Sequence, residues 1–371
     1  MKHSAPRRTS GRWAPLALGT SVVLAGALLV AVPSDAPASV RALTPSRAIA
    51  VPAAVIPAEA AVPLRTPAGQ YTVMSYNITD ASRTPEYAGL ADHPGDFDWS
   101  VRGPVIVDWI KRVSPDLLGL QEASPIRDSD GEQIDLLKQK LRGYTWVFPH
   151  RSTALAFRTS KFTKLDKGVI RVSYKGKDGS EYNRYAPWVK LRTNTGKKLL
   201  YVNLHGEYGQ TEVKAEARSA GWTRLVDGLA KINPRNRLPV VITGDFNARD
   251  DETRPVFRDH LTKLAAAGLV NASTAAKQQE TPLPGVTSFN GFGARFLGRF
   301  HYQAVRRSAV GGNLDYVWTG GAVKPVSWEV YLGPKVTWRL VDGWLVPYVK
   351  FIPSDHWPVV AKVRLVPAKS R

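Results

Sequence analysis

Six short apolar segments of the sequence each carry, at or near one end, a side chain able to bind a cation or move a proton. The segments "YTVMSYNIT", "DLLGLQEAS", "KLLYVNLHGE", "VVITGDFN", "GNLDYVWTGG" and "IPSDHWPVVAKV" hold eight such residues: Asn77, Glu122, His205, Asp245, Asn247, Asp315, Asp355 and His356. Taken singly, an acid or amide at a strand end usually caps a turn. Independent caps have no reason to combine one Glu, three Asp, two Asn and two His in this order. The set therefore indicates a chemical site.

The absence of cysteine limits the chemistry of such a site. With no cysteine in the chain there is no disulfide, no thiol nucleophile and no cysteine metal site. Any metal ion must be held by oxygen and imidazole ligands, and Mg²⁺ or Ca²⁺ demands oxygen. Asp245 and Asn247 lie two residues apart at the end of one apolar segment, which places their side chains on the same face.

Strands and helices are needed to position these residues. The segment Val240–Ile242 is typical of a strand buried on both faces, and Gly244 permits a tight turn after it. The spacing of Val105, Ile106, Trp109, Ile110 and Val113 predicts a helix within residues 102–116. A second helix is expected from Glu212 to about Ile232, with an inner stripe of Val213, Ala217, Ala220, Leu225, Val226 and Leu229. The pattern alone supports a mixture of strands and helices.

The N-terminal part of the chain differs in composition from the rest. Four basic residues precede an apolar run from about Ala14 to Val32, followed by "APA" at 36–38, so residues 1–38 are predicted to be a signal peptide. An uncleaved membrane anchor is the alternative, because the run is nearly long enough to span a bilayer. Prolines recur through residues 39–69 and predict a linker. A single catalytic domain is expected at 70–366, with a tail at 367–371, in a protein that is secreted and monomeric.

The chain is strongly basic. It has 371 residues, 43% of them hydrophobic and 22% charged, with a formal net charge of +20. Such a surface attracts polyanions, so nucleic acid, anionic lipid and cell-wall polymers are candidate partners. The loop 287–312 interleaves phenylalanines with arginines, which suits base stacking, docking on an anionic bilayer, or simple packing at a sheet edge.

The motifs "LLGLQE", "GDFNA", "LDYV" and "SDHWPV" occur in an order that resembles the endonuclease/exonuclease/phosphatase superfamily of deoxyribonuclease I-like, metal-dependent phosphoesterases. The resemblance spans about Tyr71 to Leu365. It implies an α+β fold, a four-layer α/β sandwich in which two mainly antiparallel β-sheets pack face to face with helices outside. The site residues are then expected at one rim of the sandwich.

The resemblance also implies roles for the site residues. Glu122 would bind Mg²⁺, with Mn²⁺ or Ca²⁺ possible, and Asn77 and Asp355 would stand near the same ion. Asp245 would orient the attacking water, and Asn247 would donate a hydrogen bond to the phosphate. Asp315 would hold the ring of His356, which acts as a base or as a charged stabiliser; a metal bound directly by His356 is the alternative.

Two further basic side chains would contact the substrate phosphate: His205, for which a general-acid role is also open, and Arg184 of "RYAPWVKL". Some relatives carry a second carboxylate where this chain has Thr79, which puts a second metal site in doubt. The resemblance therefore implies an exported, metal-dependent phosphodiesterase, most simply a nuclease. A sphingomyelinase-like or inositol-phosphate phosphoesterase is the alternative, followed by a polyanion-binding module without activity.

Overall fold

Two β-sheets form the centre of the structure. The acids, amides and histidines singled out in the sequence lie at or near the ends of their strands. The computed structural model describes residues 67, 69–83, 98–124, 133–150, 152–172, 174–175, 179, 181–280, 286–291, 303–304, 312–334, 336–341, 344–349 and 351–367. All of them lie within one compact unit of the chain, Val62–Arg371. The predicted signal peptide, most of the predicted linker and most of the tail lie outside the described residues.

The larger sheet has seven strands. In order across the sheet these are β12 (Gln278–Gln279), β15 (Val323–Val330), β18 (Val359–Leu365), β1 (Gln70–Asn77), β2 (Leu117–Gln121), β4 (Thr153–Arg158) and β3 (Tyr144–His150). The pairs β1–β2 and β12–β15 are parallel, and the other four neighbouring pairs are antiparallel.

The smaller sheet has six strands. In order these are β11 (Leu269–Asn271), β14 (Asp315–Gly320), β10 (Val240–Asp245), β9 (Lys198–His205), β8 (Tyr185–Thr193) and β5 (Phe162–Arg171). Only the pair β9–β10 is parallel. On the inner face of this six-stranded sheet, Leu191, Tyr201 and Val317 share one buried cluster with residues of the seven-stranded sheet. The two sheets therefore pack face to face.

The two sheets lie close together at Gly119 on β2. A Cβ atom at this position would lie 2.1 Å from the Thr243 hydroxyl and 2.6 Å from the Asn203 amide oxygen of the opposite sheet, so only glycine fits. Asn203 also crosses between the sheets, because its amide donates to the carbonyl oxygens of Leu120 and Ala154. The buried polar contacts fix how the two sheets are placed against each other.

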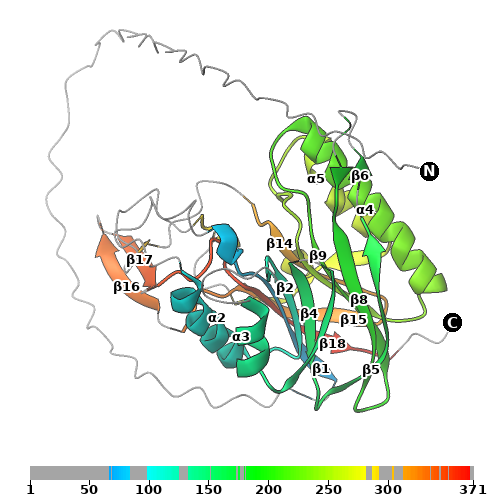
Figure 1. The fold of residues 1–371 in the computed structure, drawn as a ribbon, viewed down its shortest axis with the longest axis horizontal. Coiled ribbons are helices and arrows are strands. Elements are labelled where there is room, and N and C mark those ends of the chain that lie inside the picture. Colours follow the sequence, from blue (N-terminus) through cyan, green and yellow to red (C-terminus); the bar gives the residue numbers. More distant parts are fainter. Residues whose placement is uncertain are drawn as a thin grey trace, which may run out of the picture. The chain divides into compact units, whose positions relative to one another are not determined.

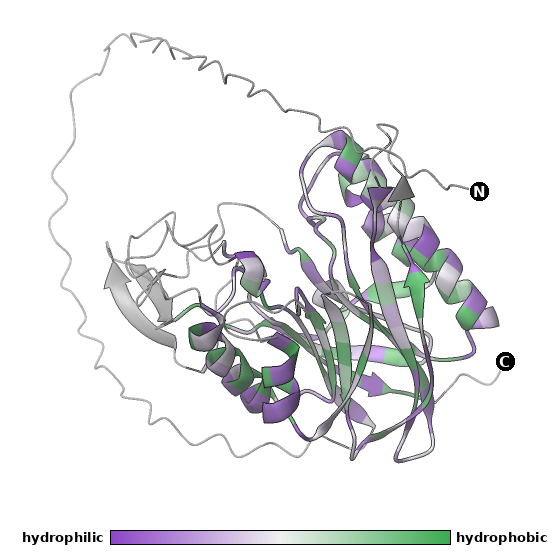
Figure 2. Cartoon of the chain, viewed as in Figure 1, coloured by the Kyte–Doolittle hydropathy of each residue, from purple (hydrophilic) through white to green (hydrophobic). Residues whose placement is uncertain are grey.

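Helices cover both outer faces (Figure 1). The helices α2 (Trp99–Val113) and α3 (Gln133–Lys140) share a buried cluster with the seven-stranded sheet. The helices α4 (Glu212–Ile232) and α5 (Pro255–Ala266) pack on the six-stranded sheet. Polar and apolar residues alternate along α4, as expected for a helix with one face on a sheet and one in solvent (Figure 2). The predicted four-layer sandwich is confirmed.

The two helices expected from the sequence differ from the structure in detail. The helix predicted within residues 102–116 begins earlier, at Trp99, whose buried ring anchors the first turn, and ends at Val113, because Ser114 is left-handed and a proline follows. The helix from Glu212 to Ile232 has the predicted bounds. Its inner face holds Arg218 and Trp222, which the predicted stripe omitted, while Val213, Ala220 and Val226 are only partly buried.

Smaller elements complete the described structure. They are η1 (Ala81–Arg83), η3 (Pro234–Asn236), α6 (Ala272–Ala275), a pair of short strands β6 (Tyr174–Lys175) and β7 (Glu181–Tyr182), and a three-stranded sheet of β13 (Gln303–Ala304), β17 (Trp344–Val349) and β16 (Val336–Val341). Among the described residues no helix is long and apolar enough to cross a membrane.

Candidate active site

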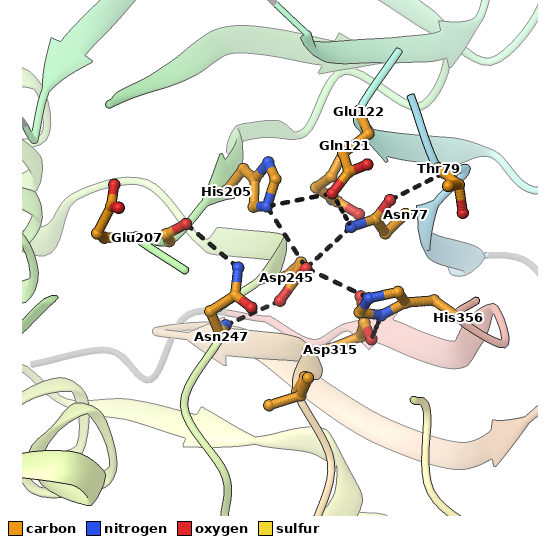
Figure 3. Close-up of polar contacts among 12 residues, drawn as sticks. Asn77, Thr79, Gln121, Glu122, His205, Glu207, Asp245, Asn247, Asp315 and His356 are labelled. Atoms are coloured by element: carbon orange, nitrogen blue, oxygen red, sulfur yellow. Dashed lines mark hydrogen bonds and ion pairs between the residues drawn. The ribbon is translucent and has the colours of Figure 1, made fainter. Parts of the chain in front are cut away.

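Strand ends from both sheets meet at one rim of the sandwich. The parallel strands β1 and β2 end at Asn77 and Gln121, which are paired in register, and Glu122 follows. In the other sheet Asp245, at the end of β10, is in register with His205 at the end of β9 and with Asp315 at the start of β14. Figure 3 shows these side chains converging from the two sheets. The eight residues that the sequence singled out therefore form one cluster.

Three residues of this rim have left-handed backbone conformations. Thr79 (φ 56°), Glu122 (φ 58°) and Asn247 (φ 49°) each lie one or two residues beyond a strand. Non-glycine residues adopt this region at a cost, which is greatest for a β-branched residue such as threonine. The sharp turns direct the side chains back over the ends of the strands.

Asp245 is at the centre of the cluster. Its Oδ2 accepts a hydrogen bond from the Asn77 amide at 2.9 Å and lies 3.6 Å from His205 Nε2 and 3.7 Å from His356 Nε2. Its Oδ1 accepts from the backbone N–H of Asn247 at 2.8 Å. Burial and the charge of Asp315 raise the pKa of Asp245, and the two imidazoles oppose this shift.

Asp315 and His356 form a buried pair. His356 Nδ1 lies 2.7 Å from Asp315 Oδ2, and the backbone N–H of Asp315 donates to the Ser288 hydroxyl. Burial disfavours a charged imidazole, but the carboxylates of Asp315 and Asp245 outweigh it and raise the pKa of His356 well above its ordinary value. Asp315 therefore holds the ring of His356 in place and favours its charged, imidazolium form.

Glu122 and Asp355 provide a second pair of carboxylates. Glu122 Oε1 accepts from the Asn77 amide at 3.1 Å and Oε2 from the backbone N–H of Asp80 at 2.8 Å. Burial, and then the negative charge of Asp355, raise the pKa of Glu122. Two carboxylates that repel each other in a buried site, with an amide oxygen nearby, are the oxygen ligands that a divalent cation such as Mg²⁺ needs. The residues present fit such an ion.

A second group of possible ligands involves His356 directly. Asp245, Asp315 and His356 each place one ligand atom within 4.8 Å of the others. A metal-bound histidine must be neutral, however, whereas Asp315 and Asp245 favour the charged form of His356. The hydrogen bond between His356 and Asp315 accounts for this group without a metal ion, so Glu122 and Asp355 are the better ligand candidates.

His205 differs from His356 in its charge. Burial lowers the pKa of His205 to about 4, with smaller contributions from the charges of Arg184 and His356 in the same direction, against the opposing charge of Asp245. The ring is thus neutral at pH 7. Its Nε2 faces both Asp245 and Glu122, the latter at 3.9 Å from Oε1. The site therefore combines one neutral and one charged imidazole on either side of Asp245.

Comparison with known proteins identifies the family. Residues 99–356 match the model of the "Endonuclease/Exonuclease/phosphatase family". The chain belongs to this family. Its members are hydrolases that act on phosphoester bonds with the help of a metal ion, so the chain is a metal-dependent phosphoesterase. No curated protein sequence matches the chain.

Solved structures show the same fold. A Bacteroides thetaiotaomicron endonuclease/exonuclease/phosphatase family protein is 20% identical, with a TM-score of 0.59, covering 80% of this chain and 98% of that one. A mannosyl-6-phosphatase from the same organism is 21% identical, with a TM-score of 0.57, covering 79% and 99%. The human Nocturnin catalytic domain with bound sulfate is 20% identical, with a TM-score of 0.53, covering 80% and 94%.

Arg184 lies beside the family site without joining the cluster of eight. Its Nε donates to Glu207 Oε2 at 3.0 Å, and Lys214 Nζ donates to the other oxygen of Glu207 at 2.7 Å. Arg184 and Glu207 line a small recess next to His205, together with the buried Arg218 of α4. Glu207 was missed in the sequence, although its position two residues after His205 could have drawn attention to it.

Two buried residues outside the cluster support its loops. The guanidinium of Arg102 on α2 donates to the carbonyl oxygens of Ile78, Thr79 and Pro353. The Gln133 side chain on α3 donates to the Thr79 carbonyl, and its oxygen accepts from the backbone N–H groups of Ala81 and Ser124. Neither residue carries a sequence signal, because their partners are carbonyl and N–H groups that every residue has.

Most of the aromatic and basic loop 287–312 lies outside the described residues, namely positions 292–302 and 305–311. Within the described part, the Phe289 ring packs edge-on against His356, with 5.0 Å between the ring centres.

A third buried histidine, His260 on α5, should make the stability of the folded protein depend on pH. The ring is fully buried among Trp222, Phe246 and Tyr316, and neither nitrogen has a hydrogen-bond partner among the described residues. Burial, with the charges of Arg218 and Arg258, lowers the pKa of His260 to about 3. Below pH 6.5 the histidine binds a proton in the unfolded chain but not in the folded one. The free energy of unfolding therefore decreases as the pH falls towards about 3, by up to about 1.4 kcal/mol per pH unit.

Replacing His260 by phenylalanine should remove this contribution. We expect the urea midpoints of wild type and His260→Phe to be similar at pH 7.5 and to separate as the pH falls to 5, with the variant more stable. His205 contributes in the same direction but is present in both proteins, so the difference isolates His260. Parallel curves over this range would contradict the prediction.

Proposed function

We propose that this phosphoesterase is exported and hydrolyses the phosphodiester bonds of nucleic acid, by in-line attack of a water molecule. The observation that carries the proposal is the position of the Asp245 carboxylate. It lies between a neutral and a charged imidazole, with Asn77 bridging it to Glu122. This arrangement can orient a water molecule on one side and stabilise phosphoryl charge on the other.

The ion that serves the reaction is proposed to be Mg²⁺, with Mn²⁺ or Ca²⁺ as substitutes. Glu122, Asp355 and Asn77 would hold it. When bound, it would neutralise part of the charge on the phosphoryl oxygens.

The chain's own groups then have separate tasks. Asp245 accepts the hydrogen bond of the attacking water and takes its proton, and its raised pKa brings it closer to the range of an efficient base. His356, in the imidazolium form that Asp315 and Asp245 favour, stabilises the negative charge that develops on phosphorus-bound oxygen. Its contact with Asp315 keeps it charged and oriented.

His205 and Asn247 face the phosphate in this proposal. His205 is neutral and its Nε2 faces two carboxylates, which favours a proton on that nitrogen and lets it donate to a phosphoryl oxygen. The Asn247 amide, now donating to the Gly206 carbonyl at 3.3 Å, is the second donor. Arg184 would contact substrate phosphate from the edge of the site.

The choice of nucleic acid as substrate is supported by charge. The net charge of +20 favours a polyanion over a small neutral molecule. Two arginines also lie beside the cluster: Arg83 Nη1 is 3.8 Å from Glu122 Oε1, and the charge of Arg184 contributes to the lowered pKa of His205. Export is supported by the apolar N-terminal run and the "APA" site, and N-terminal sequencing of the exported protein, expected to begin at Ser39, tests it.

A substrate panel tests the proposed function. Protein from Ser39 onward is incubated with plasmid DNA, RNA, sphingomyelin and inositol phosphates, with Mg²⁺, Mn²⁺, Ca²⁺ or EDTA. We expect nicking of DNA or cleavage of RNA with a divalent cation and none in EDTA. Release of a lipid headgroup or of inositol-bound phosphate instead would replace nucleic acid by that substrate, and binding of polyanions without turnover would contradict the proposal.

The variant Glu122→Gln ties the activity to this site. Loss of a ligand charge should lower the rate by about 100-fold or more, because cation affinity falls with it. Glu181→Gln, which changes an exposed carboxylate on β7, is the matched control and should keep the wild-type rate. Cleavage by a contaminating nuclease would be the same in the preparations of both variants.

A further inference from the structure

Thr79 is a β-branched residue in a backbone conformation that is unfavourable for that residue type. It lies two residues beyond the end of β1, is 1% exposed, and has a φ of 56°. Left-handed conformations are rare for β-branched residues and persist only where the surroundings hold them. The Thr79 N–H donates to Asn77 Oδ1 at 3.0 Å, so the strained turn is closed on the Asn77 side chain.

The Thr79 hydroxyl connects this turn to Asp355. The hydroxyl donates to Asp355 Oδ1 and accepts from the backbone N–H of Asp355 at 3.1 Å. Its oxygen also lies 2.8 Å from the Ser354 hydroxyl, which donates to the Asn77 carbonyl at 2.7 Å. Two hydroxyls therefore join loops that are more than 270 residues apart in the chain.

The carbonyl of Thr79 is held from the opposite side. Arg102 and Gln133 both donate to it, at 3.1 and 3.0 Å. Side chains from α2 and α3 thus hold the backbone of Thr79, and the hydroxyl of the same residue contacts Asp355.

We propose that Thr79 is a positioning residue for the divalent-cation site: its hydroxyl fixes the Asp355 carboxylate opposite Glu122. The inference rests on the cation site of the proposed function. Without the hydroxyl, Asp355 loses a hydrogen bond to its carboxylate and one to its backbone, and the repulsion from Glu122 moves the carboxylate away. The site then has to be reorganised whenever a cation binds.

The test measures binding of Mn²⁺ alone, by calorimetry or electron paramagnetic resonance, without substrate. Thr79→Val keeps the shape and the β-branch but removes the hydroxyl, and we expect its Kd to rise by about 10-fold or more. Thr79→Ser keeps the hydroxyl and should bind Mn²⁺ with an affinity close to that of wild type. A purely structural role would lower the unfolding temperature of the variants without separating their affinities in this way.

Thr79→Ala guards against a folding failure of the valine variant. Alanine tolerates the positive φ better than valine and also lacks the hydroxyl, so its Kd should rise as that of Thr79→Val does. Wild-type affinity in a folded Val or Ala variant would overturn the inference, as would a serine variant as weak as valine. If wild type binds no Mn²⁺, the cation site of the proposed function fails, and the role of Thr79 with it.

Discussion

Replacing His356 by glutamine should lower the rate constant of phosphoester hydrolysis by about 10³-fold, within the range seen for groups that transfer protons or stabilise charge in a transition state. Glutamine can still donate one hydrogen bond, but it cannot carry the charge that Asp315 and Asp245 induce on the imidazole. The substitution therefore separates the charge of the ring from its capacity to form a hydrogen bond.

The measurement is a single-turnover assay at saturating substrate, which reports the chemical step. His260→Phe is the matched control, because it removes another fully buried histidine outside the cluster, and it should keep the wild-type rate at pH 7.5. If His356→Gln retained more than about a tenth of the wild-type rate, the charge of His356 would not be needed for hydrolysis.

Replacing Arg102 by methionine should destabilise the folded protein by about 3 kcal/mol or more. Methionine fills much of the same volume but leaves the carbonyl oxygens of Ile78 and Pro353 without their buried donor. Since these carbonyls belong to the two loops that carry Thr79 and Asp355, we expect the loss of stability to be accompanied by weaker cation binding.

The midpoint of urea unfolding checks this prediction. Arg112→Met on the same helix is the matched control, since Arg112 is half exposed and, among the residues that the structure describes, pairs with the half-exposed Asp108 one turn away. Its effect should stay within about 0.5 kcal/mol. Equal midpoints for the two variants would show that Arg102 does not support the loops.

The eight residues of the cluster could be predicted because each interrupts an apolar segment. An acid such as Asp245 directly after "VVIT" is conspicuous in a pattern that otherwise demands buried residues. Their order along the chain then matched a family pattern, and the fold followed from it. The charge states of His205 and His356 could not be predicted, because they depend on burial and on which carboxylate lies nearest in three dimensions.

The supporting residues were not predictable for a different reason. Arg102 and Pro353 are 251 positions apart, and nothing in either local sequence indicates the contact. Trp99 shows the same limit for helix boundaries: its burial against the sheet, rather than any capping motif, starts α2. Periodicity reports which face of an element is apolar, but not which distant backbone groups need a partner.

The location of the cluster has a consequence for how activity is acquired. Asn77 and Glu122 come from one sheet, whereas His205, Asp245 and Asp315 come from the other, and the two groups meet through the hydrogen bond from Asn77 to Asp245. In a newly made or partly unfolded chain whose two sheets are apart, each sheet thus holds only part of the cluster, and neither part is a complete site. Activity therefore requires the two sheets to dock, so the rate of turnover also reports whether they have docked.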